Sequence, residues 1–352
     1  MSYNLARQLV QRGHSVTVYT SYSNQTDTQG YVDGIFVKRF RRVWIGRWWP
    51  DQAMPTMALD LIRNRFDFVH SFDIENFQSL LTSALARFSN ESLIVNATLH
   101  PIYRTYKETA GRFVLDSADA IIVQCEQEKQ SLPSYVDRKR VFVVPCGIDS
   151  RMFSRMPDSN LFREKYSIST TDRVVLYVGP VGGRKAVSSL VRIMPRVVRA
   201  VERSRLVVIA RGSDFDELRK IVTDNGISDR VTFLGRVGDE ELLQAYAGSD
   251  IFAFPSMHES FGIVLLEAAA AGLPIVSTRV GVAPEIVNDG VNGHLCETCD
   301  ADFADRVIEV LSQDRYRRTA ENLRSEILDR FDWSSAAGFL EKVYSNVGLR
   351  NR

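Results

Sequence analysis

Short apolar runs of strand character alternate with helical stretches along this chain, and that alternation constrains its fold more than any other feature. The runs of the first series lie at residues 15–20, 67–70, 92–95, 120–123 and 141–144. A second series follows the polar segment 149–171, with runs at 174–178, 206–209, 231–234, 251–254 and 274–277. Strands that alternate with helices form parallel sheets covered on both faces. The sequence therefore predicts two α/β units joined by one linker.

The length of the chain agrees with two units. A single hydrophobic core stops growing near ~250–300 residues, and this chain has 352 residues. The pattern opens inside a helix near Asn4, because Leu5, Leu9 and Val10 stand at helical spacing. Ligands of doubly wound sheets bind at the carboxyl ends of the strands, so a cleft between the two units is the expected active site.

Composition excludes several classes of protein. Apolar residues make up 45% of the chain, charged residues 25%, and the formal net charge is +1, so the chain lacks the basic field of a nucleic-acid-binding protein. No apolar run reaches the ~18 residues that a membrane-spanning helix needs. Four sparse cysteines and no signal peptide indicate a reducing cytoplasm. Any contact of the protein with a membrane is expected to be at the membrane surface. Cys296 and Cys299 form one CxxC, which we interpret as a coincidence in a loop rather than a zinc or redox motif.

Residues 254–267 carry the richest pattern in the chain. An apolar strand ends at Phe254, and Ser260 is the expected N-cap of a helix that runs to Gly272. The start of such a helix offers free backbone N–H groups and the positive end of a dipole, which suit a phosphate. The carboxylates of Glu259 and Glu267 can accept hydrogen bonds from sugar and ribose hydroxyls. The alternative interpretation is that both glutamates merely cap and solvate the helix.

Two glutamates with seven residues between them, around Ser-Phe-Gly, also mark the retaining glycosyltransferases of family four, which this chain resembles. Residues 231–235 resemble the base-binding loop of that family, and residues 284–293 resemble its next conserved stretch. The resemblance implies that Glu259 and the amides of 261–264 hold the transferred sugar and the diphosphate, while Glu267 holds the ribose. The implied donor-binding residues are Arg184, Lys185, Gly235, Glu259, Ser260, Phe261, Gly262, Ile263, Val264 and Glu267.

The resemblance further implies an α/β fold of GT-B architecture, with two Rossmann-like doubly wound parallel-sheet domains that face a cleft. The N-terminal, acceptor-side domain is expected over residues 1–155 and the nucleotide-sugar-binding domain over 156–330. A last helix over 331–352 is expected to cross back to the first domain. Family members begin with a strand and a glycine-rich loop that this sequence lacks, so either the chain begins upstream of Met1 or this form is damaged. Because that strand is central in a doubly wound sheet, its two neighbours are expected to be unpaired.

The loop at 179–186 corresponds to a phosphate-facing pattern of the family, Gly-Arg followed by Lys-Gly. Lys185 matches the lysine, whereas Pro180 stands at the arginine position and Ala186 at the second glycine. Arg184 offers a guanidinium from a different angle, and bidentate phosphate contacts depend on angle. In the family these charges neutralise the diphosphate in place of a metal, so neither metal nor cofactor is expected and the sugar nucleotide is a substrate. A solvated loop pair is the alternative interpretation.

Five histidines are distributed along the chain. His100, which follows the strand at 92–95, matches the active-site histidine of the family, and the implied catalytic residues are His100, Lys185 and Glu259. His70 repeats this pattern more weakly, with a functional and a structural interpretation left open. His14, His258 and His294 are expected to be structural or exposed.

Residues 37–49 combine aromatic with basic side chains. They contain five basic residues, no acidic residue and three of the four tryptophans of the chain. An anionic membrane interface, a protein partner or acceptor groove, and ordinary packing are all compatible with this composition. The side chains concerned are Lys38, Arg39, Arg41, Arg42, Trp44, Arg47, Trp48 and Trp49.

The predicted function is transfer of a sugar from a nucleoside diphosphate to the hydroxyl of a sugar or lipid-linked acceptor, with retention, in glycan, glycolipid or cell-surface polysaccharide synthesis. The alternative is a catalytically weak or inactive partner subunit, which Pro180 and the absent first strand favour. A GT-B epimerase would lack the two-glutamate pattern. A dinucleotide-dependent dehydrogenase would need G-x-G-x-x-G after a strand, which residues 179–183 do not supply.

Overall fold

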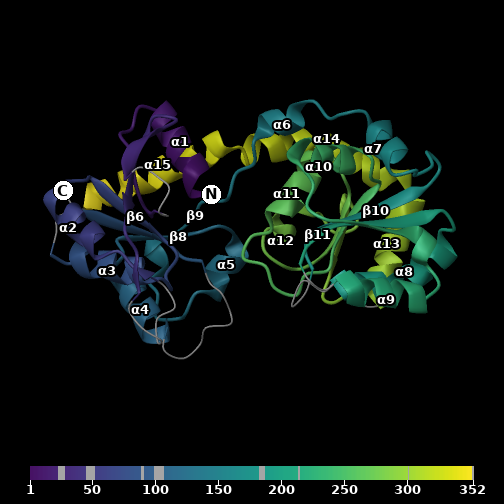
Figure 1. The fold of residues 1–352 in the computed structure, drawn as a ribbon, viewed down its shortest axis with the longest axis horizontal. Helices are drawn as coiled ribbons and strands as arrows, with labels where there is room; N and C mark the ends of the chain where they lie inside the picture. Colours follow the sequence, from purple (N-terminus) through teal and green to yellow (C-terminus); the bar gives the residue numbers. More distant parts are fainter. Residues whose placement is uncertain are drawn as a thin grey trace. The chain divides into compact units, whose positions relative to one another are not determined.

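The chain folds into two compact units, which are described separately below (Figure 1). The computed structural model describes residues 1–22, 28–44, 52–88, 91–98, 107–181, 187–212, 215–299 and 301–350. Unit 1 comprises Met1–Gly147 and Trp333–Arg352, and unit 2 comprises Ile148–Asp332. The two α/β units predicted from the strand-helix alternation are therefore present.

Unit 2 contains a six-stranded parallel sheet in the order β12-β11-β10-β13-β14-β15. The strands are β10 (Arg173–Pro180), β11 (Ser204–Arg211), β12 (Val231–Leu234), β13 (Ile251–Phe254), β14 (Ile275–Thr278) and β15 (Gly293–Cys296). The direction of winding reverses between β10 and β13, because the chain adds strands on one side of β10 and then on the other. In doubly wound sheets such a reversal opens a crevice at the carboxyl ends of the strands.

Helices cover both faces of this sheet, which explains why its strands are continuous apolar runs. Figure 1 shows α8, α9 and α13 on one face and α10, α11 and α14 on the other. Short helices α6, α7 and α12 complete the unit. The bounds are α6 (Ser150–Ser154), α7 (Ser159–Lys165), α8 (Val187–Ala200), α9 (Phe215–Asp224), α10 (Asp239–Ala247), α11 (Ile263–Ala270), α12 (Ala283–Ile286), α13 (Ala301–Ser312) and α14 (Asp314–Arg330).

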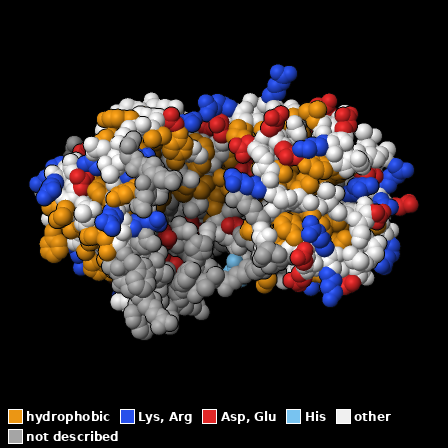
Figure 2. Space-filling model, viewed as in Figure 1, with side chains coloured by type: hydrophobic (Ala, Val, Ile, Leu, Met, Phe, Trp, Pro, Cys, Tyr) orange, Lys and Arg blue, Asp and Glu red, His pale blue; other side chains and the backbone are white. Residues whose placement is uncertain are grey.

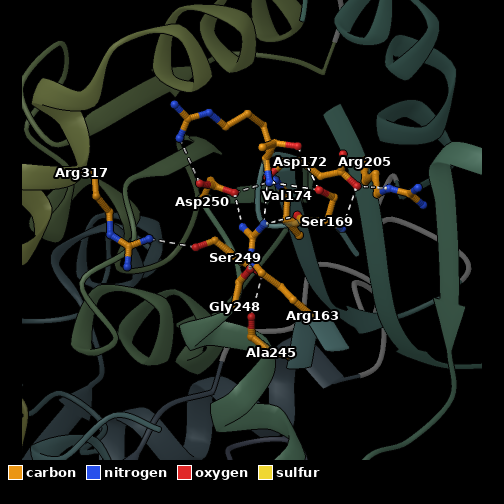
Figure 3. Close-up of polar contacts among 12 residues, drawn as sticks. Arg163, Ser169, Asp172, Val174, Arg205, Ala245, Gly248, Ser249, Asp250 and Arg317 are labelled. Atoms are coloured by element: carbon orange, nitrogen blue, oxygen red, sulfur yellow. Dashed lines mark hydrogen bonds and ion pairs between the residues drawn. The ribbon is translucent and has the colours of Figure 1, made fainter. Parts of the chain in front are cut away.

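A buried arginine organises the amino ends of β10 and β13 (Figure 3). The Nε of Arg163, on α7, donates to the carbonyl of Gly248 at 2.9 Å, and Nη1 donates to the carbonyls of Ser169 and Asp172 at 2.8 and 2.9 Å. Its Nη2 lies 2.8 Å from Oδ2 of Asp250. The guanidinium is thus supplied with acceptors from two loops, the one between α7 and β10 and the one between α10 and β13, as a buried charge requires.

Unit 1 contains a four-stranded parallel sheet in the order β6-β7-β8-β9 and a separate three-stranded sheet in the order β1-β3-β2. The strands are β1 (Thr17–Ser21), β2 (Gln29–Val32), β3 (Ile35–Phe40), β6 (Phe68–Phe72), β7 (Ser92–Asn96), β8 (Ala120–Val123) and β9 (Val141–Val143), with a short antiparallel pair β4 (Val43–Trp44) and β5 (Gln52–Ala53). Every residue of β7 and β8 is buried. These two strands therefore form the centre of the core of unit 1.

The two parallel ladders of unit 1 do not join in the described ranges of the chain. Within the part of the chain that the structure describes, β1 pairs with β3 alone and β6 pairs with β7 alone. A doubly wound domain would place a central strand between β1 and β6. Each of these two strands thus has one strand neighbour among the described residues, which agrees with the expectation that both lack a partner on one side.

Helix α15 (Trp333–Arg350) belongs to unit 1 although it ends the chain. It packs against α1 (Ser2–Gln11), where Glu341 lies 2.9 Å from Nη1 of Arg12 and 2.8 Å from Nε2 of His14. Tyr344 of α15 stacks on Phe68 with ring centroids 4.6 Å apart. The other helices of the unit are α2 (Pro55–Arg63), α3 (Phe77–Ala86), α4 (Lys107–Ser117) and α5 (Glu126–Ser131).

His70 lies on β6 inside this packing. Its ring stacks on Phe72 at 4.5 Å, its Nδ1 lies 3.3 Å from the hydroxyl of Tyr344, and its buried Nε2 has no hydrogen-bond partner among the residues that the structure describes. Burial lowers the pKa of His70 to about 4. These surroundings favour the structural interpretation of this residue.

The depressed pKa of His70 predicts that acid destabilises unit 1. The pKa of His70 is near 6.5 in the unfolded state and about 4 in the folded state. Between these pH values His70 is protonated in the unfolded state and neutral in the folded state. The stability contributed by neutral His70 is complete above pH 6.5 and is lost as the pH falls toward 4. Between pH 7.5 and pH 5 the free energy of unfolding of the wild type should fall by about 2 kcal/mol more than that of a His70→Phe variant.

Urea unfolding followed by tryptophan fluorescence measures this difference, because all four tryptophans (Trp44, Trp48, Trp49 and Trp333) belong to unit 1. A variant of the exposed His258, His258→Gln, is the control and should keep the wild-type pH dependence. Equal acid destabilisation of the wild type and His70→Phe would contradict this account of His70.

Candidate functional site

The candidate site lies where the winding of the unit 2 sheet reverses. β10 ends at Pro180 and β13 ends at Phe254, and these two strands are neighbours in the sheet. The loop 255–262 leads from β13 into α11. Gly235 follows the end of β12, at the same carboxyl edge of the sheet, and is exposed.

The loop 255–262 is held by one hydrogen bond within itself and by two from the segment 278–282, at and after the end of β14. The buried Ser256 donates from Oγ to the carbonyl of His258 at 3.0 Å. Thr278, the last residue of β14, donates from Oγ1 to the carbonyl of Ser256. The backbone N–H of Val282 donates to the carbonyl of Phe261 at 2.8 Å. The loop is therefore anchored at its beginning and at its end.

Helix α11 begins at Ile263, with Gly262 as its N-cap. The prediction that Ser260 is the N-cap is wrong, because Gly262 adopts a left-handed φ of +86° and turns the chain into the helix two residues later, whereas the predicted stop of the helix at Gly272 is confirmed. The helix ends at Ala270, and Gly272, with a φ of +76°, reverses the chain. Gly262, the N-cap, has no side chain that could cap the helix, and the positive end of the α11 dipole lies at the carboxyl edge of the sheet.

Glu267 projects from the second turn of α11 and is half-buried. Its Oε2 accepts a hydrogen bond of 2.8 Å from the hydroxyl of Tyr246, a fully buried residue of α10. Burial raises the pKa of Glu267, and the hydrogen bond from Tyr246 acts in the opposite direction. One oxygen of this carboxylate is thus fixed by the protein.

Glu259 lies close enough to Tyr177 of β10 to raise the pKa of that tyrosine, which burial raises most. The hydroxyl of Tyr177 donates to the carbonyl of Pro180 at 3.0 Å. The side chain of Glu259 also lies beside Gly262. A Cβ added to Gly262 would stand 3.2 Å from Cγ of Glu259. The structure therefore brings Glu259, the end of β10 and the start of α11 together.

Apart from Gly235, the predicted residues divide into two groups. The structure gathers Glu259, Ser260, Phe261, Gly262, Ile263, Val264 and Glu267 in one loop and helix at the carboxyl edge of unit 2. His100, Arg184 and Lys185 lie outside the described residues. Sequence reasoning missed Tyr246 and Tyr177, since a tyrosine in an apolar helix or strand has the pattern of an ordinary core residue.

The basic and aromatic segment 37–49 is described in part. Lys38 is on β3, where its Nζ lies 2.9 Å from Oδ2 of Asp60 and 5.9 Å from the ring centroid of Tyr19. The charge of Lys38 is therefore paired with a carboxylate of unit 1. Arg41 and Arg42 are exposed. Arg47, Trp48, Trp49 and the side chain of Trp44 lie outside the described residues.

His294 is buried in β15, between Asp289 at 3.0 Å from Nδ1 and the hydroxyl of Tyr316 at 2.8 Å from Nε2. These contacts give it a structural role in unit 2. On the face drawn in Figure 2, basic and acidic side chains are interspersed among the described residues. None of the described helices is long and apolar enough to cross a membrane.

Two protein-family models match the chain, one on each unit. The model of "Glycosyltransferase Family 4" matches residues 1–151. The model of "Glycosyl transferases group 1" matches residues 158–326, which contain the candidate site. Together they span nearly the whole chain.

Similar proteins agree with these matches. The D-inositol 3-phosphate glycosyltransferase of Mycolicibacterium smegmatis is 35% identical over 275 residues, which are 75% of this chain and 60% of that protein. The sucrose-phosphate synthase of Thermosynechococcus elongatus has a similar structure, with a TM-score of 0.81, 20% identity, and coverage of 99% of this chain and 93% of the other. Anabaena HepE in complex with UDP-glucose has a TM-score of 0.71 at 20% identity, covering 89% and 87%. The structural likenesses show a shared GT-B fold.

Proposed function

Because the chain belongs to family four of the glycosyltransferases, we propose that it transfers a sugar from a nucleoside diphosphate to an acceptor hydroxyl with retention at the anomeric carbon. The observation that carries the proposal is the position of Glu259, the start of α11 and Glu267 along one carboxyl edge, where the winding reverses. Helix N-termini at such edges bind phosphate.

Each part of the site takes a different part of the donor in this proposal. The amides at the start of α11 bind the diphosphate, Glu259 binds the transferred sugar, and Glu267 accepts hydrogen bonds from the ribose hydroxyls. Gly235, at the end of β12, lies in the loop that receives the base. Glu267 suits the ribose because it is half-buried and one of its oxygens is already engaged by Tyr246.

The proposed reaction needs stabilisation of the departing diphosphate. That group takes the acceptor proton on the face from which it leaves, so its negative charge must be stabilised in the transition state. The α11 dipole supplies part of this stabilisation, and Arg184 and Lys185 supply positive side chains. His100 is proposed to contact the sugar at the reacting centre.

The donor and acceptor are proposed by class. UDP and UDP-hexoses are the first donors to test, since Anabaena HepE was solved with UDP-glucose. An inositol phosphate is the first acceptor to test, because the name of the mycobacterial relative contains one. Other acceptors are sugar or lipid-linked hydroxyls of glycan, glycolipid or cell-surface polysaccharide synthesis.

A transfer assay tests this function. The protein is incubated with a panel of nucleoside diphosphate sugars and acceptors, nucleotide release is followed, and the anomeric configuration of the product is read by NMR. The proposal expects product with the configuration of the donor. Inversion, or no release of nucleotide with any donor, would reject it.

Removal of divalent metal ions is expected to leave turnover unchanged. In the proposed site, positive charge comes from α11, Arg184 and Lys185 rather than from a bound ion. The measurement compares kcat with excess EDTA and with added Mg²⁺ or Mn²⁺. A loss of activity in EDTA that Mg²⁺ restores would show that this part of the proposal is wrong.

Replacement of Gly281 by alanine should weaken donor binding by about tenfold or more. Gly281 has a φ of +55°, and an added Cβ would stand 2.2 Å from the carbonyl oxygen of Phe261. That oxygen accepts the hydrogen bond from Val282 which holds the end of the site loop. The added methyl group therefore displaces the start of α11, and calorimetric titration with UDP measures the effect.

Gly226→Ala is the matched control. Gly226 also has a positive φ, of +65°, but an added Cβ would meet no atom within 4 Å. It should cost some stability and leave the affinity for UDP unchanged. Equal affinities of wild type, Gly281→Ala and Gly226→Ala would exclude the loop from the binding site.

A second candidate function is a partner subunit without transferase activity, the inactive form of the weak or inactive alternative stated above. It is favoured by Pro180, which is exposed at the end of β10 where family members carry a phosphate-facing arginine. Under this alternative, neither the wild type nor Pro180→Arg releases nucleotide from any donor. Turnover by either protein would exclude it.

We also propose a cytoplasmic location at the membrane face, with contact through the segment 37–49. The exposed Arg41 and Arg42 support it, since arginines attract anionic headgroups. Sedimentation with phosphatidylglycerol vesicles, and with phosphatidylcholine vesicles as control, tests the contact. The protein should sediment with the anionic vesicles only, and an Arg41→Gln/Arg42→Gln variant should sediment less.

A further inference from the structure

Tyr246 is buried in unit 2 and yet directs its hydroxyl to the candidate site. Its side chain is fully buried, with ring centroids 6.4 Å from Phe153 and 6.1 Å from Phe252. Its Oη lies 2.8 Å from Oε2 of Glu267. Because the ring of Tyr246 is packed on two sides, it cannot move with the carboxylate of Glu267. Its hydroxyl therefore favours one orientation of that carboxylate.

A glutamate that binds a ribose must satisfy two conditions. It must be ionised, because only the carboxylate accepts hydrogen bonds with both oxygens. It must also be held in one rotamer, because each free torsion lowers the affinity. Burial works against the first condition, since it raises the pKa of Glu267, and the charge of Asp239 raises it further. A donated hydrogen bond opposes both effects.

We propose that Tyr246 is a positioning residue for the donor, whose hydroxyl fixes Oε2 of Glu267 and leaves Oε1 to accept from the ribose hydroxyls. This inference rests on the proposed function of the site. Tyr246 does not touch the donor itself. It acts through Glu267, which it orients and keeps ionised.

The prediction concerns recognition of ribose hydroxyls rather than affinity in general. In the wild type, UDP should bind more tightly than 2′,3′-dideoxy-UDP, because only UDP offers hydroxyls to Glu267. In Tyr246→Phe the preference for UDP should fall by about tenfold, the size expected for a lost hydrogen bond to a charged group. The pH below which UDP binding is lost should also move upward, because Glu267 loses the donor that favours its ionised form.

Tyr316→Phe is the matched control. Tyr316 is also fully buried in unit 2, and its hydroxyl donates to the carboxylate of Glu309 on α13, which lies outside the candidate site. This variant likewise removes a buried hydroxyl that donates to a carboxylate, and it also removes the partner of Nε2 of His294. It should leave the preference for UDP and its pH dependence unchanged.

Calorimetric titrations of the full chain with both nucleotides separate the possible failures. Glu267→Ala should abolish the preference for UDP, and if it does not, the proposed donor site is wrong. If Glu267→Ala abolishes the preference while Tyr246→Phe keeps it, only the positioning role is overturned. A Tyr246→Phe variant that weakens UDP and 2′,3′-dideoxy-UDP equally would show a purely structural role, and it would overturn the inference as well.

Discussion

Replacement of Glu259 by glutamine is expected to lower kcat by about 100-fold or more while the protein remains folded. The substitution keeps the shape of the side chain and removes its charge. Glu259 stands between β10 and the start of α11, where the transferred sugar is proposed to lie, and positive charge develops on that sugar as its bond to the diphosphate breaks. A fixed carboxylate stabilises the transition state more than the ground state.

Steady-state kinetics of nucleotide release measure this effect. Glu240→Gln is the control, because Glu240 is an exposed carboxylate in the first turn of α10 in the same unit. It should retain the wild-type kcat. If Glu259→Gln and Glu240→Gln turn over at the same rate, Glu259 has no part in the chemical step.

Replacement of Arg163 by methionine should destabilise unit 2 by about 3–5 kcal/mol. Methionine fills a similar volume, but it leaves the carboxylate of Asp250 without its closest cation. It also leaves the carbonyls of Gly248, Ser169 and Asp172 without the guanidinium that they accept from (Figure 3). Unpaired polar groups in a buried position cost most of this free energy.

The two units can be followed separately in this experiment. Tryptophan fluorescence reports on unit 1, since all four tryptophans belong to it, and far-UV circular dichroism reports on both units. Unfolding of unit 2 should therefore appear as a transition in circular dichroism that fluorescence does not detect. Arg163→Met should lower the urea midpoint of this transition. Arg318→Met, which changes an exposed arginine of α14, should not. A wild-type urea midpoint for Arg163→Met would show that the buried contacts contribute little.

The fold could be predicted largely because its strands are buried on both faces. Such strands are continuous apolar runs, and the predicted run 251–254 coincides with β13. The hairpin of β2 and β3 was not predicted, although Asp33-Gly34 between two strands is its usual signal. The structure gives these residues φ angles of +49° and +79°, as a two-residue hairpin loop requires.

The candidate site could be predicted only where its residues are near in sequence. Glu259 and Glu267 share one loop and helix, so their spacing identified them. Tyr246 comes from another helix and meets Glu267 only through the packing of α10 beside α11, which no local pattern encodes. Arg163 was missed for the same reason, since its partners come from loops up to 87 residues away.

The arrangement of a bound nucleotide tests the central proposal most directly. A crystal structure of the protein with UDP should place the diphosphate against the backbone N–H groups of Ile263 and Val264, and the ribose hydroxyls within hydrogen-bonding distance of Glu267. A nucleotide bound elsewhere, with the start of α11 and Glu267 free of it, would contradict the assignment of the donor site.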